Sequence, residues 1–334
     1  MSVEGAAGRR AEGYVLVLAA ATCWAGGGLI AKWLFTMPGP ATAAWPFPPL
    51  GIVVDPLVLS AARAFVSALI ALVYLLVRRR DQLKVRGRDL PFLAFFGVFG
   101  LALVHFAYFK TISLTGVATA ILLEYLAPVV VLIVSVAVLG TRLTWALPAA
   151  VGLSVTGCAL MVGAIGGDGL SVSGEGLFWG LASAVLFAGY SLMGRYAARR
   201  FTPWTLLTYG LTAATLFWFV FLGGPGRVIT LLSDWRALLA VIVLAVVSTI
   251  IPFGAFLKAL HFVEATQASV TSTIEPVVAG VAAWFIFGEH LSWLQLLGGG
   301  LVIAAVVLSQ FRTRVPAEMP VVTDVGFADG VPRV

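Results

Sequence analysis

Long uninterrupted apolar runs are the feature of this sequence that most constrains its fold. The first extends from Tyr14 to Phe35, and similar runs follow almost to the end of the chain. A helix needs about 20 mostly apolar residues to cross the hydrocarbon core of a bilayer. A spanning segment must also satisfy its own backbone hydrogen bonds, so continuous runs of this length form helices. The chain is therefore predicted to be an all-α integral membrane protein.

The composition supports the same class. Hydrophobic residues make up 60% of the chain and charged residues only 11%, whereas soluble domains carry about 25% charged residues. Charged residues, glycines and prolines divide the apolar sequence into ten predicted crossings. They lie at about 14–36, 57–77, 91–112, 116–140, 145–165, 175–197, 203–222, 235–258, 264–288 and 291–311.

Basic residues are distributed unevenly over the predicted loops. Six of them lie between Arg78 and Arg88, after the second crossing, whereas the opposite side carries little beyond Arg227 and Arg236. Cytoplasmic loops are enriched in Lys and Arg, so both termini are predicted to be cytoplasmic in a protein of the plasma (inner) membrane. The net charge of +6 then reflects orientation in the bilayer, and no nucleic acid partner is expected.

The two ends of the chain are short and polar. Residues 1–13 are a predicted cytoplasmic lead-in, and residues 312–334 are a predicted disordered cytoplasmic tail without hydrophobic periodicity. The three histidines are scattered and show no metal-ligand spacing, and no phosphate-binding glycine loop occurs. We therefore expect no metal site and no cofactor. We also expect no ATP-binding site in this chain that could power transport.

An internal repeat relates the two halves of the sequence. When the chain is aligned with itself so that Lys110 falls on Lys258, a set of positions matches without a gap, and we call this the first repeat alignment. The further matched pairs are Pro128 and Pro276, Gly140 and Gly288, Trp145 and Trp293, and Gly152 and Gly300. A second repeat alignment places Glu12-Gly13 on Glu175-Gly176. It needs a larger shift, so the first half has extra residues between its first two crossings.

The repeat predicts two five-helix units, at 14–165 and 175–311. Because five is odd, the second unit must cross the membrane in the opposite sense to the first. Inverted repeats of this kind are characteristic of secondary transporters, which bind substrate at the interface between the repeats. The predicted fold is therefore ten transmembrane helices, arranged as two inverted five-helix repeats around a central cavity.

Two stretches carry a resemblance to a known family. The sequences ALHFVEATQASVTSTIEPVVAGVAAWFIFGEHLSW and LLEYLAPVVVLIVSVAVLGTRLTW resemble the drug/metabolite transporter superfamily, specifically its ten-helix EamA branch. The resemblance covers about residues 14–311. It implies export or exchange of small metabolites, often amino acids, without ATP. One departure is that the turn Gly140-Thr141-Arg142 lacks the glutamate that Glu289 supplies in the second half.

Pro128 and Pro276 lie near the middle of the fourth and ninth crossings. Each proline removes a backbone donor and clashes with the carbonyl four residues back, that of Glu124 or of Ser272. Irregular backbone at membrane depth is tolerated only beside protein or a water-filled cavity, so both kinks are predicted to face the cavity. The alternative is that they are packing kinks, relieved by the hydroxyl groups of residues 271–273.

Three charged residues inside the crossings are predicted site residues. An ionisable group at the bilayer centre costs about 2.5 kcal/mol or more, so Glu124 and Glu275 are assigned to binding a substrate or a proton. Arg63 is assigned either to a substrate carboxylate or to a structural ion pair with an interior carboxylate. An arginine in this helix also recurs in the family that the chain resembles. For Glu275 the alternative is likewise a structural pair.

Four further side chains complete the predicted site. His105 lies inside the third crossing, where protonation could follow pH, and Trp24, Tyr108 and Tyr190 are aromatic residues at or near mid-span. For each of the four the alternative is a packing role. Two other features lie nearer the surface. Lys110 and Lys258 are expected to snorkel to the headgroups, and the Pro-rich insertion 37–56 either covers the outer mouth or is a tolerated loop.

These features favour a secondary transporter over an enzyme. The expected activity is export or exchange of small metabolites, most favourably amino acids or related compounds, with protons as a candidate coupling ion. One alternative is a carrier of drugs and lipophilic cations on the same fold, because buried carboxylates and aromatic side chains would suit such cargo. A membrane enzyme is disfavoured, since no cluster of nucleophile, base or metal ligands occurs in the sequence.

Overall fold

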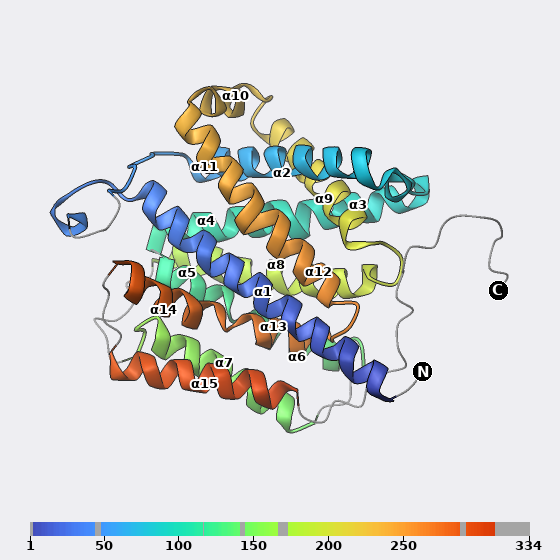
Figure 1. Ribbon diagram of the computed structural model, residues 1–334, viewed down its shortest axis with the longest axis vertical. Helices are drawn as coiled ribbons and strands as arrows, with labels where there is room; N and C mark the ends of the chain where they lie inside the picture. The colour runs from blue at the N-terminus through green and yellow to red at the C-terminus, as the bar shows by residue number, and fades with distance from the viewer. Residues whose placement is uncertain are drawn as a thin grey trace.

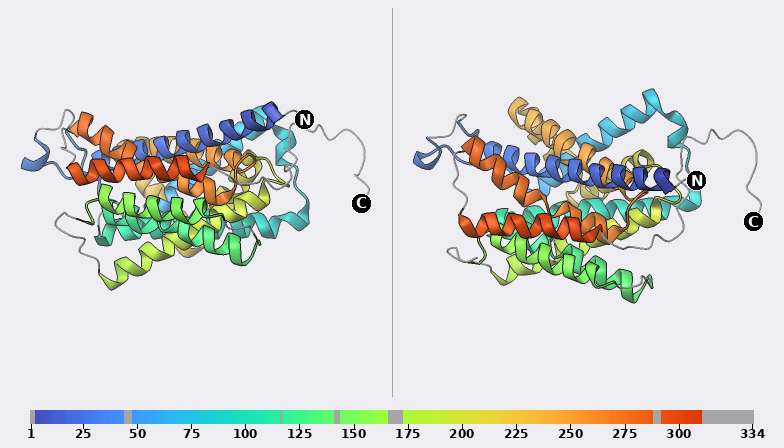
Figure 2. Two further views of the ribbon diagram at one scale, coloured as in Figure 1. Left: turned by 90° about the horizontal axis from the view of Figure 1, so that it is seen from below. Right: turned by 60° about the horizontal axis from the view of Figure 1, so that its bottom comes forward.

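The computed structural model describes residues 3–43, 48–115, 117–140, 144–165, 173–287 and 292–310. Helices dominate these residues, and no strand occurs among them. The long helices lie side by side and form one bundle (Figures 1 and 2). The start of α1 and the end of α15 lie at the same end (Figure 1). Helices of both sequence halves are thus packed into one bundle.

Fifteen α-helices follow one another along the described chain. In order they are α1 Val3–Phe35, α2 Pro56–Arg78, α3 Leu90–Gly97, α4 Leu103–Thr115, α5 Val117–Glu124, α6 Ala127–Ala137, α7 Ala146–Met161, α8 Gly174–Ala197, α9 Pro203–Phe221, α10 Gly226–Ser233, α11 Trp235–Ala245, α12 Ile251–Ala259, α13 Ala265–Ser272, α14 Glu275–Phe287 and α15 Trp293–Ser309. Short 3-10 helices occur at Pro40–Thr42, Arg80–Leu83 and Gly87–Asp89.

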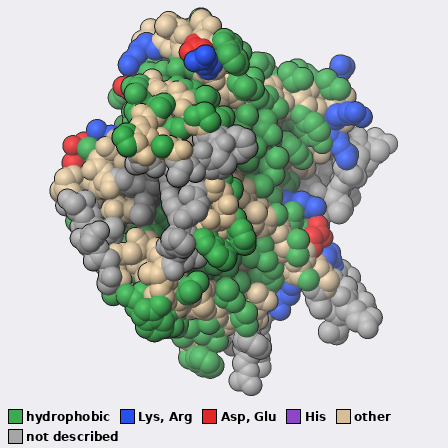
Figure 3. Space-filling model, turned by 60° about the vertical axis from the view of Figure 1, so that its left-hand side comes forward, with side chains coloured by type: hydrophobic (Ala, Val, Ile, Leu, Met, Phe, Trp, Pro, Cys, Tyr) green, Lys and Arg blue, Asp and Glu red, His purple; other side chains and the backbone are tan. Residues whose placement is uncertain are grey.

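The lengths of these helices confirm an all-α membrane protein. Eight helical segments among the described residues are long and apolar enough to cross a bilayer. Two further apolar helices, α7 and α15, have 16 and 17 residues, somewhat fewer than the roughly 20 of a full crossing. Hydrophobic side chains cover most of the face in Figure 3, and charged side chains lie mainly toward its edges.

The ends of the chain differ in part from the prediction. Helix α1 begins at Val3 and not at Tyr14, because the lead-in residues continue the same helix. The predicted tail, 312–334, lies outside the described residues, as do the Thr141-Arg142 turn and its counterpart at Glu289. Four residues of the insertion, 44–47, are likewise outside the described part.

Two crossings contain matching π-helical segments. Val98–Ala102 joins α3 to α4, and Val246–Ile250 joins α11 to α12. The two segments fall on each other, residue for residue, in the first repeat alignment. A π-helical turn accommodates one extra residue and often occurs at functional sites. The third and eighth crossings therefore share local backbone geometry at repeat-matched positions, in addition to matching residue types.

Both proline-containing crossings are interrupted. Helix α5 ends at Glu124 and α6 begins at Ala127, while α13 ends at Ser272 and α14 begins at Glu275. These boundaries also coincide in the first repeat alignment. The proline is the second residue of the following helix in each case, where its missing N–H group is not needed within that helix. Each proline thus starts a new helix near the middle of its crossing.

The helices pack in two groups that exchange elements between the sequence halves. Helix α1 packs against α11–α14, and we call these five helices the α1 group. Helix α8 packs against α4, α5 and α6, and we call these four helices the α8 group. The first helix of each half therefore lies among helices of the other half, as Figure 1 shows for α1 beside α12 and α13.

Exposed ion pairs follow the same exchange. Lys258 on α12 pairs with Glu12 on α1, with 2.9 Å between Nζ and Oε1. Lys110 on α4 pairs with Glu175 on α8, with 3.2 Å between Nζ and Oε1. Both pairs join matched positions of the repeat, and each lies within one helix group. The lysines, which the sequence suggested would snorkel to headgroups, are therefore held by carboxylates.

Candidate substrate cavity

A cavity of about 480 Å³ lies between the α1 group and the α8 group. Its wall includes Trp24 from α1, Phe109 from α4 and Phe187 from α8. It reaches Met37 and Val53, which are 62% and 84% exposed. We call this end of the bundle the mouth end, and the end at which α1 begins the closed end. Under the predicted orientation the mouth faces outward.

Glu275 lies at the helix break in the ninth crossing and lines the cavity. Its Oε2 accepts a hydrogen bond of 2.5 Å from the Tyr125 hydroxyl group, which comes from the matching break between α5 and α6. The same hydroxyl oxygen is 3.0 Å from the carbonyl oxygen of Ser272. The two helix breaks are therefore connected through one tyrosine.

The Tyr125 contact also explains how the proline kink is tolerated. Pro276 deprives the Ser272 carbonyl of its helical donor. The hydroxyl groups of Ser272 and Thr273 donate instead to the carbonyls of Ser269 and Val270, at 2.8 and 2.6 Å. The freed carbonyl therefore depends on the Tyr125 hydroxyl group of the other half, whose one proton it shares with Glu275, and not on these neighbouring hydroxyl groups, which one alternative from the sequence had suggested.

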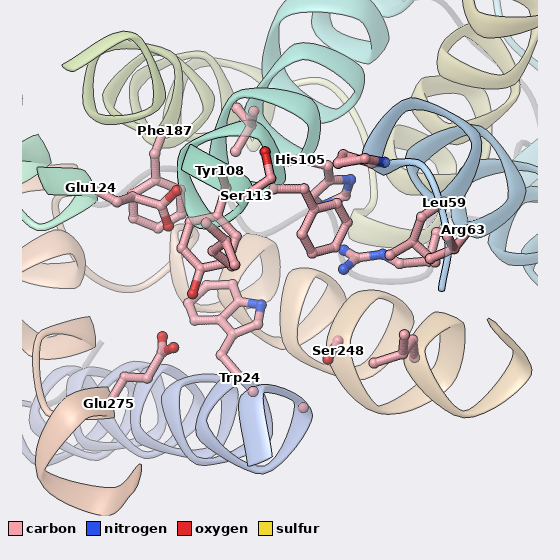
Figure 4. Close-up of a pocket in the computed structure, with 18 of the residues that line it drawn as sticks. Trp24, Leu59, Arg63, His105, Tyr108, Ser113, Glu124, Phe187, Ser248 and Glu275 are labelled. Atoms are coloured by element: carbon pink, nitrogen blue, oxygen red, sulfur yellow. The ribbon is translucent and has the colours of Figure 1, made fainter. Parts of the chain in front are cut away.

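Glu124 is the last residue of α5 and also lines the cavity. Its Oε2 is buried and has no hydrogen-bond partner among the described residues. Figure 4 shows Glu124 and Glu275 on the same side of the cavity, approaching it from different helices. This side of the cavity therefore presents two carboxyl groups.

The opposite side of the cavity carries nitrogen donors. Arg63 of α2 is only 6% exposed, and its guanidinium carbon lies 4.9 Å from the centre of the Phe109 ring. Arg63 Nε and His105 Nε2 are both buried without a hydrogen-bond partner in the described part of the chain. Figure 4 places Arg63 and His105 across the cavity from Glu124 and Glu275. The suggested structural ion pair for Arg63 is not present among these residues.

The predicted aromatic residues divide into two kinds. Trp24 and Tyr108 line the cavity, whereas Tyr190 does not. Tyr190 is fully buried behind Phe187 and Phe253, because its ring stacks on Phe187 and its hydroxyl group donates to the Phe253 carbonyl at 3.2 Å. Tyr190 therefore supports the wall from behind and does not contact the space that a substrate would fill.

Some wall residues were not predicted from the sequence. Phe187, Phe253 and Ser248 line the cavity, but nothing distinguishes them in sequence from residues that face lipid. Gly27 is different, because it lies in the run Gly26-Gly27-Gly28, and glycines in a membrane helix often mark a close neighbour. A Cβ atom at Gly27 would lie 1.7 Å from Ser248 Oγ, so α1 and the π-helical segment Val246–Ile250 approach each other closely only because position 27 is glycine.

The fold and the site together define a polytopic membrane protein. Its solute-sized cavity lies between two helix groups and has carboxyl groups on one side and nitrogen donors on the other. The sequence profile of the EamA-like transporter family matches residues 11–163 and 174–311. The chain belongs to this family. It is a small-molecule transporter and not an enzyme.

Individual relatives agree with this assignment. An uncharacterized transporter of Archaeoglobus fulgidus is 32% identical over 220 residues, covering 63% of this chain and 74% of the relative. The pseudopaline exporter CntI of Pseudomonas aeruginosa is 28% identical over 245 residues, covering 73% and 83%. The threonine/homoserine exporter RhtA of Escherichia coli is 27% identical over 236 residues, covering 66% and 72%.

A solved crystal structure shares the fold. It superposes with a TM-score of 0.68 at 20% sequence identity and covers 90% of this chain and 96% of its own. At this level of identity the likeness concerns the arrangement of the helices. Substrate and mechanism must therefore be argued from the cavity itself.

Proposed function

We propose that this chain is a secondary carrier of the plasma membrane that exports or exchanges amino acids or related zwitterions by alternating access. The placement of charge in the cavity carries the proposal. Glu124 and Glu275 lie on one side and Arg63 on the other (Figure 4). A zwitterion between them would direct its ammonium group to the carboxylates and its own carboxylate to the guanidinium, with its side chain among Trp24 and Phe187.

The unpaired polar atoms of the wall support this proposal. Arg63 Nε, His105 Nε2 and Glu124 Oε2 are buried without partners among the described residues. Each such atom costs about 1–3 kcal/mol while it is unsatisfied. A solute that donates on the glutamate side and accepts on the arginine side would recover part of this free energy. An exporter among the relatives, named for threonine and homoserine, supports cargo of this chemical type.

Alternating access would use the inverted repeat. The paired π-helical segments and the paired helix breaks, which coincide in the first repeat alignment, support a duplicated architecture. With both termini in the cytoplasm, Leu50→Cys should react with an impermeant thiol reagent added outside, and Lys84→Cys only after permeabilisation. Both variants would be made in a chain without Cys23 and Cys158. Labelling of both positions from the same side would contradict the topology.

Protons are the proposed coupling ion, with Glu275 as the carrier. This carboxylate lies at a helix break and accepts a hydrogen bond from Tyr125. Protonation would remove its charge from the cavity wall and reverse that hydrogen bond. The charge of the wall and the hydrogen bonding of the break would then change together, which is what a coupled carrier requires.

The decisive experiment is transport by the purified chain in proteoliposomes. Labelled amino acids would be offered with and without a proton gradient, and Arg63→Gln would be measured beside the parent. We expect gradient-stimulated movement of at least one amino acid in the parent and a strongly raised KM in Arg63→Gln. An Arg63→Gln variant with unchanged KM for a transported amino acid would contradict the zwitterion proposal.

One observation favours a second candidate, efflux of lipophilic cations. The wall combines two carboxyl groups with Trp24, Tyr108, Phe187 and other aromatic rings, and a desolvated cation is attracted to both. Such cargo has no carboxylate for Arg63. Transport of a lipophilic cation that persists in Arg63→Gln, with no amino acid transported by the parent, would favour this alternative.

A further inference from the structure

The closed end of the cavity is formed by layers of aromatic and aliphatic contacts between α8 and α12. Phe187 and Phe253 line the cavity, and the Tyr190 ring centre lies 5.1 Å from that of Phe253 and 5.7 Å from that of Phe256. One turn further, Gly194 faces Leu257 and Leu260, since a Cβ atom there would lie 2.9 Å from each. These layers close the described part of the bundle at this end.

Arg195 lies beyond these layers, near the end of α8. Its Nη2 is 2.5 Å from Glu264 Oε1, its Nε is 3.3 Å from Oε2, and its Nη1 donates to the Leu260 carbonyl at 2.6 Å. The side chains of Arg195 and Glu264 are 18% and 34% exposed. A bidentate, partly buried arginine–carboxylate pair of this kind is among the stronger polar contacts in proteins.

This ion pair joins the two helix groups. Arg195 belongs to α8, and Glu264 immediately precedes α13 of the α1 group. The pairs Lys258–Glu12 and Lys110–Glu175 each lie within one group and are more exposed. Separation of the two groups at the closed end would therefore break the Arg195–Glu264 pair and leave the other two intact.

The repeat maps the closed end onto the open mouth. The second repeat alignment applies to α8 and the first to α12, so Phe187 corresponds to Trp24, Phe253 to His105 and Phe256 to Tyr108. All three counterparts line the cavity. Phe187 and Phe256 are in contact, with 5.8 Å between their ring centres, whereas no ring contact joins their counterparts Trp24 and Tyr108, which both face the cavity. Closure of the mouth would bring α1 onto α4 as α8 now lies on α12.

The two ends differ at three positions that matter for closure. Tyr190, which fills the closed end, corresponds to Gly27, and Arg195 corresponds to Lys32. Glu264 corresponds to Gly116, so the sequence provides no carboxylate at the mouth position that matches it. At the matched positions, glycines therefore take the place of both the central aromatic ring and the acidic partner of the closed end.

We propose that the Arg195–Glu264 pair holds the gate at the closed end shut, and that the glycines at the positions matching Tyr190 and Glu264 make the mouth-open conformation the resting state. This inference rests on the proposed alternating-access function. The pair, which we call the lock, holds the α8 group against the α1 group, and it must break once in each transport cycle. Weakening it shifts the population toward a conformation that is open at the present closed end.

The test measures the conformation directly and needs no substrate. Leu257→Cys places a thiol inside the closed layers, where the native side chain is only 1% exposed. The reporter would be made in a chain without Cys23 and Cys158 and labelled with a water-soluble thiol reagent in detergent. We expect Glu264→Gln to speed labelling about tenfold, the shift that loss of one charge-assisted contact typically causes. The double variant Arg195→Glu with Glu264→Arg should restore slow labelling.

Matched controls separate the lock from general loosening. Glu12→Gln breaks an ion pair at the same end but within the α1 group, and we expect it to leave the labelling rate unchanged. If Glu264→Gln does not yield a monodisperse protein, Arg195→Gln breaks the same pair from its other side. Unchanged labelling in the folded variant, or equal acceleration by Glu12→Gln, would overturn the lock. Transport in proteoliposomes is scored separately, so failure of the lock and failure of the proposed function give different results.

Discussion

Replacement of Tyr125 by Phe tests the contact that joins the two helix breaks. The Tyr125 hydroxyl group is within hydrogen-bond distance of the Ser272 carbonyl, at 3.0 Å, and of Glu275, at 2.5 Å. The hydroxyl group carries one proton, so it donates to only one of these oxygens at a time. Ser272 is fully buried, so water cannot take the place of this donor at its carbonyl. Glu275 is less buried and faces the cavity, where water can reach it.

The loss of stability should therefore come mainly from the Ser272 carbonyl. An unsatisfied buried acceptor costs about 1–3 kcal/mol, and interhelical hydrogen bonds in membrane proteins are worth about 0.6 kcal/mol on average and at most about 1.7. Pro276 lacks the N–H group that would donate to this carbonyl in a continuous helix, so we expect the upper part of the second range. The predicted decrease in the free energy of unfolding is about 1–2 kcal/mol.

Tyr190→Phe is the matched control. It also removes a buried hydroxyl group that donates to a backbone carbonyl, that of Phe253. Phe253 lies inside α12, so the helix itself already supplies a donor and the loss should be smaller. The assay is reversible denaturation of both variants in the same detergent, followed by the pH dependence of transport. Equal stability losses, or a Tyr125→Phe variant that matches the parent in stability and pH profile, would refute this explanation.

Three further predictions follow from other contacts. Glu275→Gln keeps the volume of the side chain and removes its charge, so gradient-driven transport should be lost in a folded, monodisperse protein; parent rates with unchanged pH dependence would remove Glu275 from the mechanism. Gly157→Val should destabilise the bundle by about 1–3 kcal/mol in a denaturation assay, because a Cβ atom there would lie 2.8 Å from the Gly298 carbonyl oxygen. A Cβ atom at Gly152 would have no neighbour within 4 Å, so Gly152→Val should be tolerated in the same assay. Burial lowers the pKa of His261, in the loop after α12, from 6.5. The unfolded chain therefore binds the proton more readily, and the stability of the fold decreases as the pH drops below that value. His261→Gln should remove this acid sensitivity, and an equal loss of stability between pH 8 and pH 5.5 in the parent and the variant would argue against it.

The sequence alone predicted the class of the protein and most of its helix boundaries. The reason is that the bilayer imposes a length and an apolar composition on any spanning helix, and both are readable without tertiary contacts. The second crossing was predicted at 57–77 and the structure gives Pro56–Arg78, where Asp55 caps the helix by accepting from Leu57 N and Val58 N. Capping interactions of this kind involve only neighbouring residues, so they can be predicted from the sequence.

The sequence also indicated the charged wall residues, because a buried charge is expensive wherever it lies in a membrane. Glu124, Glu275 and Arg63 were identified for that reason, and all three line one cavity. Tyr190 was proposed on the same grounds as Trp24 and Tyr108, yet it lies behind the wall. An aromatic ring carries no such cost, so its sequence position does not tell whether it faces a cavity or a neighbouring helix.

Pairing between the two helix groups was decided only by the tertiary structure. Tyr125 reaches Glu275 across 150 positions, and Arg195 reaches Glu264 across 69. The repeat in the sequence relates positions that are equivalent, but it does not say which of them touch. Those contacts depend on how α1 and α8 pack among the helices of the opposite half, and long-range packing of this kind leaves no periodic trace in the chain.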